Sequence, residues 1–186
     1  RTQRCPMTTQ TLPPYSVQAP HDSLAELHMA CFAGVEAVAH VLAMYRVRAG
    51  DDEELFVQKV NEKTTDDSNT GGYTPLHYAC QNGFTDVARL LLEAGADPNA
   101  TKNNGATPIL CSVARAGWLG EMEPFKSCIM LLLDHPRFIL KLNDSSDKNI
   151  SPVFCCFCQK HACKDVLLPL LGIFIARGFD ACATIH

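Results

Sequence analysis

A short segment recurs along this chain, and its spacing restricts the possible folds more than any other feature of the sequence. The segment Gly72–Cys80 reads GYTPLHYAC, and a related segment, GATPIL, begins at Gly105, so that Thr74 and Thr107 stand 33 positions apart. A further copy begins at Ser151-Pro152, and a weaker one reads LHMA at 27–30. Such a period predicts a stack of small units, each of which buries its apolar face only against its neighbours.

Each copy is typical of a pair of short helices. Thr74, Thr107 and Ser151 are good helix N-caps, and each is followed by proline, which fits the first helical position. Gly72, just before the first of these caps, tolerates a left-handed turn. A second helix is expected over 84–94, where aliphatic residues recur at helical spacing before a glycine that can end the helix.

The stretch 69–100 closely resembles the ankyrin repeat. It contains Gly-x-Thr-Pro-Leu-His-x-Ala, then Gly83, then Leu90–Leu92, and it ends in Gly95–Ala100. The resemblance covers about 22–186 and is weaker outside this repeat. It implies two antiparallel helices per repeat, a β-hairpin finger between repeats, and a curved solenoid whose concave face binds partners. In the family, the histidine at position 77 braces the cap and the neighbouring finger.

The predicted fold is therefore all-α with β-hairpin fingers, an ankyrin-repeat solenoid of paired antiparallel helices. We expect an extended or disordered lead-in at 1–21 and an array at 22–186 that is part of a longer protein, which the apolar fourth repeat and the absence of an initial Met both favour. The predicted repeats are 22–61, 69–101, 102–143 and 146–183.

The sequence departs from the regular repeat at several places. The first repeat has Ala25-Glu26 in place of the Thr-Pro cap, and an acidic connection, 51–54, follows it. The third repeat carries an insertion that includes Trp118 and Pro124, and the fourth has a lengthened second helix with Pro169 inside it. Long insertions usually lie in loops, so we expect loops at the first two places.

Composition excludes several classes of function. Hydrophobic residues make up 47% and charged residues 19%, which is typical of a globular protein. The net charge of -4 and the lack of a Lys/Arg run argue against a nucleic-acid partner. The longest apolar stretch, Val166–Ala176, is too short to insert into a membrane. The chain is too long and too aliphatic to need its ten cysteines as disulfides, so we expect reduced thiols and an intracellular, cytoplasmic or nuclear, location.

Clusters of cysteine, histidine and acidic residues could indicate a metal site or a catalytic site, but each has a structural explanation. The run of cysteines at 155–163 around His161 is crowded on one expected helix and lacks the ligand spacing of zinc sites, so we expect neither metal nor cofactor. His77 and Cys80 could contact each other on one helix, but no orienting group or oxyanion donor is evident, and we expect no catalysis. The acidic runs 51–54 and 66–67 are either solvated faces or sites that recruit a basic partner.

The predicted function is a protein-interaction scaffold that holds a partner protein through the finger tips and the first helix of each repeat. The alternative is a regulatory ankyrin region of a larger enzyme or membrane channel. Tyr73 and Arg115 are the expected anchors, being of types enriched at interfaces. The predicted contact positions are Thr70, Gly71, Tyr73, Gln81, Asn82, Asn103, Asn104, Ala106, Ala114, Arg115, Asp147, Lys148, Ile150, Cys158 and Gln159. Partner binding should centre on the second and third repeats, and Gly72→Val should destabilise the array more than Gly117→Val does.

Overall fold

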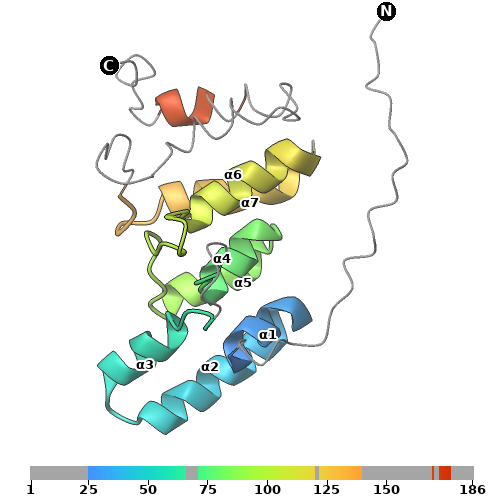
Figure 1. Ribbon diagram of the computed structural model, residues 1–186. Helices are drawn as coiled ribbons and strands as arrows, with labels where there is room; N and C mark the ends of the chain where they lie inside the picture. The colour runs from blue at the N-terminus through green and yellow to red at the C-terminus, as the bar shows by residue number, and fades with distance from the viewer. Residues whose placement is uncertain (1–24, 66–70, 120–121, 140–168, 170–171, 177–186) are drawn as a thin grey trace, which may run out of the picture.

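The computed structural model describes residues 25–65, 71–119, 122–139, 169 and 172–176, and these residues form seven labelled helices (Figure 1). Their bounds are α1 (Glu26–Ala33), α2 (Val35–Ala49), α3 (Glu53–Val60), α4 (Pro75–Gln81), α5 (Thr85–Glu93), α6 (Pro108–Leu119) and α7 (Glu123–Leu133). No helix of the described part is long and apolar enough to cross a membrane.

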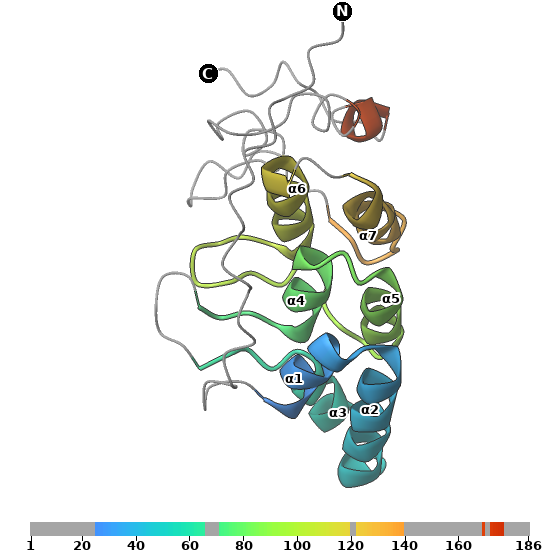
Figure 2. The same cartoon turned by 90° about the vertical axis from the view of Figure 1, so that its right-hand side faces the viewer.

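Six of the helices form two stacked layers. The first helices of successive pairs, α1, α4 and α6, lie one above another, and α2, α5 and α7 form a second layer beside them (Figure 2). Each pair packs on the next within both layers. The described part of the chain is thus a helical solenoid, as the sequence predicts. The division into four repeats stays a prediction, because most of the expected fourth repeat lies outside the described residues.

The repeated sequence positions produce a repeated core. Leu27, Leu76 and Ile109 occupy the same position in α1, α4 and α6, and each is almost fully buried. Neighbouring repeats bury these side chains against one another, which is why a single repeat would not be stable alone. Phe174, in the helical segment 172–176, is also buried and belongs to the same core cluster.

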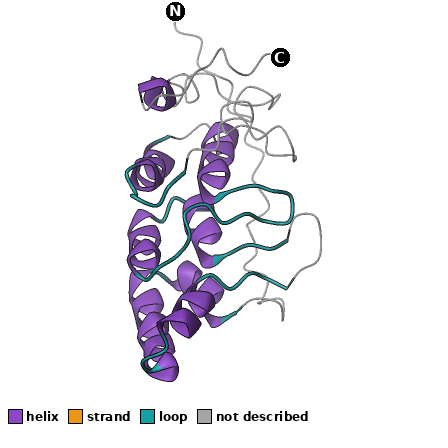
Figure 3. Ribbon diagram, turned by 90° about the vertical axis from the view of Figure 1, so that its left-hand side faces the viewer, coloured by secondary structure: helices purple, strands orange, loops and turns teal. Residues whose placement is uncertain are grey.

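The fingers are hydrogen-bonded turns. In the turn at 102–106 the backbone N–H of Lys102 donates to the carbonyl of Ala106 and that of Gly105 to the carbonyl of Lys102, both at 2.9 Å. The predicted hairpin shape is therefore present, but no β-strand is formed by the residues that the structure describes (Figure 3). These two hydrogen bonds are too few for a strand, and the preceding finger supplies another partner: the N–H of Asn103 donates to the carbonyl of Gly71 at 3.1 Å.

Two expectations about insertions are wrong. The acidic connection forms α3, because the side chain of Asp52 accepts a hydrogen bond from the N–H of Leu55 at 2.9 Å and caps the helix. Phe56 and the last residue of α3 are buried. The insertion of the third repeat lengthens α6 as far as Leu119, so Gly117 is a buried helix residue and does not open a loop.

Candidate functional site

His77 joins the second repeat to the finger of the third. Its Nδ1 atom lies 3.2 Å from the backbone N of Thr74 and 2.8 Å from the Thr74 hydroxyl, and its Nε2 atom lies 3.0 Å from the carbonyl oxygen of Ala106. Since Nδ1 accepts from the Thr74 N–H, the proton must be on Nε2, which donates to Ala106. Burial lowers the pKa of His77 to about 3, against the opposing effect of the Ala106 hydrogen bond.

His28 makes the corresponding link one repeat earlier. Its Nε2 donates to the carbonyl of Tyr73 at 2.9 Å, and burial lowers its pKa. Ala25 stands where the second repeat has its cap threonine, and the Nδ1 of His28 is buried without a hydrogen-bond partner in the described part of the chain. The two histidines therefore fix the backbone of successive fingers at the same relative place, which holds Tyr73 and Ala106 in register.

Asparagine side chains make a second set of links between fingers. The amide of Asn61 donates to the carbonyl of Gly95 at 3.1 Å and accepts from the N–H of Asp97 at 2.7 Å. Asn99 does the same with the next finger: it donates to the carbonyl of Arg137 at 2.7 Å and accepts from the N–H of Ile139 at 2.8 Å. The fingers thus form a rigid series, with backbone groups satisfied by side chains instead of a sheet.

Three aromatic side chains line one side of this series. Phe32 of α1, Tyr78 of α4 and Tyr73 of the intervening finger form a continuous group, which we call the aromatic patch. The ring centroids of Phe32 and Tyr78 lie 5.3 Å apart and those of Tyr73 and Tyr78 lie 4.9 Å apart. Phe32 is 40% exposed, and both tyrosines are half-buried. Partly exposed aromatic side chains that are already held in place are good contact groups, because little conformational freedom is lost on binding.

The side chain of Lys102 flanks the aromatic patch. The Nζ atom of Lys102 lies 4.1 Å from the ring centroid of Tyr73 and donates to its hydroxyl at 2.9 Å. Lys63, on the preceding finger, is exposed, and its charge and that of Lys102 both add to the lowering of the pKa of His77. The arrangement offers apolar contact area beside positive charge, within a chain whose net charge is negative.

The predicted contact positions differ in burial, and some of them lie outside the described residues. Tyr73 is in the aromatic patch, Asn103 is exposed at the next finger, and Gln81, Asn104, Ala106, Ala114 and Arg115 are half-buried. Gly71 is buried and its carbonyl accepts from the next finger, while Asn82 ends α4 and donates to the carbonyl of Tyr78 at 2.8 Å. Thr70, Asp147, Lys148, Ile150, Cys158 and Gln159 lie outside the described residues, as does the cysteine run at 155–163.

Sequence reasoning missed Tyr78, Phe32 and Lys102. Tyr78 could have been predicted as a contact from the sequence, because it stands four residues before the predicted contact Asn82 and so shares its helix face. Phe32 stands at the position of α1 that corresponds to Gln81. The contact between Lys102 and the ring of Tyr73 could not be found from spacing, since it depends on how closely two fingers stack.

Cysteine side chains of the described residues serve the core. Cys31, Cys80, Cys111 and Cys128 are free thiols and buried. Burial raises the pKa of Cys31 to about 12 and that of Cys80 well above its usual range, so neither forms the thiolate that a nucleophile or a metal site needs. No group of three or more His, Cys, Asp or Glu side chains among the described residues is placed to hold a metal ion.

Comparison with known proteins agrees with this geometry. The family described as "Ankyrin repeat" matches residues 71–103. The chain therefore contains an ankyrin repeat at residues 71–103. Ankyrin repeats are generally modules for protein interaction and are not catalytic.

The similar curated proteins are much longer than this chain or match only a small part of it. The 2-5A-dependent ribonuclease of Mus musculus is 49% identical over 67 residues, which are 34% of this chain and 9% of that protein. Protein phosphatase 1 regulatory subunit 27 of Homo sapiens is 51% identical over 37 residues, 20% of this chain and 24% of that protein. Rabankyrin-5 of Mus musculus is 27% identical over 119 residues, 64% of this chain and 9% of that protein.

Proposed function

We propose that the chain binds a partner protein through the finger tips and the first-helix face, with the aromatic patch at the centre of the interface. The observation that carries this proposal is the stacking of Phe32, Tyr78 and Tyr73 beside the lysine of the next finger. Tyrosine and other aromatic anchors dominate the energy of many protein interfaces. The hydrogen-bonded fingers support the proposal, because they present these side chains without a loss of backbone freedom on binding.

The contacts predicted from the sequence extend this interface. Arg115, in the third repeat, corresponds to Asn82 in the second, so both are proposed to lie on the same face as the aromatic patch. The free buried thiols are in keeping with a reducing compartment, and we propose an intracellular location, cytoplasmic or nuclear.

The test of the face is an affinity purification from cell extract, followed by a titration of the recovered partner. Tyr73→Ala together with Arg115→Ala should weaken binding by about 2 kcal/mol or more, as expected for interface anchors. The matched control is Val47→Ser in α2, where the side chain is 82% exposed and lies outside the aromatic patch. Unchanged affinity in the double variant, with an intact helical signal, would place the interface elsewhere on the solenoid.

A second candidate is a ligand-dependent regulatory region of a larger enzyme. Both a mouse and a human 2-5A-dependent ribonuclease match part of the chain, as does the tyrosine-protein kinase HTK16 of Hydra vulgaris. The ligand to test first is therefore 2-5A. The Tyr73 ring and the Lys102 ammonium group are the contacts available to a ligand with a flat ring and a negative charge. Calorimetric titration with 2-5A should show saturable binding that Lys102→Ala abolishes, and the absence of heat would remove this candidate.

A further inference from the structure

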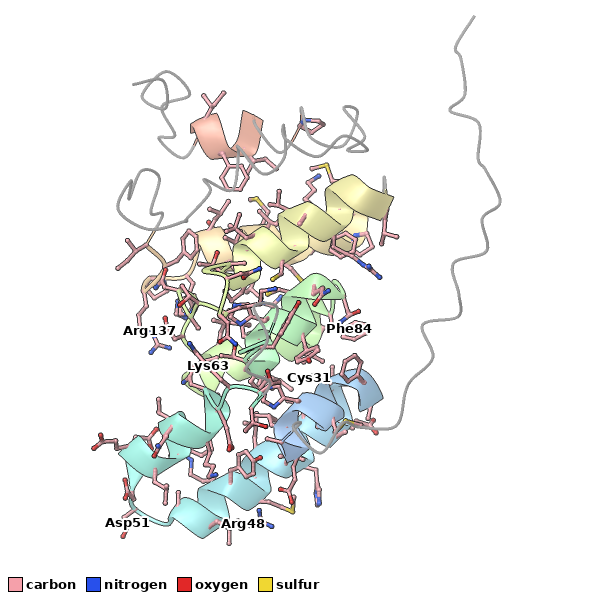
Figure 4. The ribbon with its side chains drawn as sticks, in the orientation of Figure 1. Cys31, Arg48, Asp51, Lys63, Phe84 and Arg137 are labelled. Carbon is pink, nitrogen blue, oxygen red and sulfur yellow. The ribbon has the colours of Figure 1, made fainter. Side chains whose placement is uncertain are left out.

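A groove lies at the edge of the solenoid opposite the fingers. It has a volume of about 380 Å³ and is formed where α1 turns into α2 and α4 turns into α5. Figure 4 shows Phe84 at this edge, with Lys63 and Arg137 at the finger edge. Its floor includes Cys31, and a side-chain carbon at Gly34 would meet no heavy atom within 4 Å, so the space above that glycine is open. The volume is in the range of sites that accept one side chain or a small ligand.

The groove is bordered by large apolar side chains that water reaches. Phe32 is 40% exposed, and Val35 and Phe84 are each 39% exposed. Val35 is the first residue of α2, and Phe84 is the N-cap residue just before α5. Each follows the glycine that separates the two helices of its repeat, and so the two side chains recur along this edge. Scattered apolar residues on a surface are ordinary, but a group of them around a hollow is typical of a docking site.

The charge of the groove favours one class of occupant. Asp86 is the one charged residue that lines it. Its carboxylate is exposed and takes part in none of the ion pairs formed by the described residues. A basic group placed beside the apolar border would meet this carboxylate, whereas an acidic group would be repelled.

We propose that this groove is a second docking site, which takes a partner segment carrying one apolar side chain next to a lysine or arginine. The apolar side chain fills the hollow between Phe84 and Val35, and the basic side chain pairs with Asp86. The groove and the finger tips lie at opposite edges, and Phe32 is the residue that the groove shares with the aromatic patch. A partner segment in the groove can therefore leave Tyr73 and the finger tips free for another protein.

The probe is a random heptapeptide library on phage, selected on the immobilised wild-type chain and counter-selected on Phe84→Ser. The enriched peptides should share an apolar residue next to a basic one. A synthetic peptide of that consensus, titrated by fluorescence anisotropy, should bind at least tenfold more weakly to Phe84→Ser. Asp86→Asn should weaken it severalfold, and added salt should weaken binding to the wild-type chain more than binding to Asp86→Asn.

Controls separate the groove from the rest of the surface. Val47→Ser removes another exposed apolar side chain and should leave the affinity unchanged. The urea midpoint of Phe84→Ser reports whether that variant folds. If it does not fold, the peptide affinity of Asp86→Asn tests the proposal instead. Failure to enrich a peptide, an acidic consensus, or affinity equal to wild type in Asp86→Asn would overturn the proposal. A loss of peptide binding in Lys102→Ala would also overturn it, because the peptide would then lie on the aromatic patch.

Discussion

Replacing Ala25 by threonine should stabilise the protein. The backbone of Ala25, with φ -66° and ψ 158°, already has the extended conformation of Thr74, with φ -90° and ψ 164°, but Ala25 makes no side-chain cap. A threonine hydroxyl there would reach the Nδ1 atom of His28, the buried nitrogen that has no partner in the described part of the chain. Ala25 lines a hollow of about 310 Å³, so there is room for the larger side chain.

Two contributions set the size of the effect. Replacing alanine by threonine at an N-cap is worth about 1 kcal/mol. Giving a buried acceptor its hydrogen bond adds roughly another 0.5–1.5 kcal/mol. We therefore expect Ala25→Thr to raise the free energy of unfolding by about 1.5 to 2.5 kcal/mol, and Thr74→Val to lower it by a similar amount, because Thr74 already makes the corresponding contact with His77.

Urea unfolding followed by circular dichroism measures this directly. The slope of the free energy against urea should stay the same while the midpoint rises. Ala25→Val is the matched control, since valine has the shape of threonine without the hydroxyl. Equal midpoints for the threonine and valine variants would refute the reasoning, because the gain would then come from shape alone.

Further predictions concern the histidine, the fingers and the thiols. The pKa of His77 lies far below the ordinary value of 6.5, so over this range the unfolded chain binds a proton that the folded chain does not bind. The free energy of unfolding should therefore fall as the pH drops below about 6.5, by up to about 1.4 kcal/mol per pH unit, and continue to fall towards pH 3. Urea midpoints should be less sensitive to pH over this range in His77→Gln. Gly72→Ala should lower the free energy of unfolding by about 1–3 kcal/mol more than Gly50→Ala, because both glycines have positive φ but only at Gly72 would the new carbon meet a side-chain oxygen, that of Asn103; equal urea midpoints would contradict the stacking of the fingers. Cys80 should resist a thiol reagent until the protein unfolds, and mass spectrometry showing fast labelling of the native chain would contradict its burial.

Most of the fold could be predicted from the sequence because it depends on local rules that recur with a period. The cap at Thr74, the positive φ of Gly72 and the buried positions of α4 and α5 all follow from the spacing of residue types. The insertion around Trp118 was wrongly expected to lie in a loop, because local rules do not say whether extra residues extend a helix or form a loop after it. The capping role of Asp52 was missed because an acidic run has the same composition in a solvated loop and in a first helical turn.

The candidate site was less predictable than the fold. Tyr73 was identified because it stands in a predicted finger and is of a residue type that is enriched at interfaces. Its packing against Tyr78 and Lys102 depends on how closely neighbouring fingers approach. That approach is set by hydrogen bonds between residues far apart in the sequence, such as the link from His28 to the carbonyl of Tyr73. Spacing within one repeat contains no information about such contacts.

The measurement that tests the central claim most directly is amide hydrogen exchange with and without the bound partner protein. The account predicts slower exchange in the finger and first-helix segments 71–82 and 102–115 when the partner is bound. Exchange in the outer helices α2 and α5 should be unchanged. Protection confined to the outer helices, with none in the two finger segments, would contradict the account.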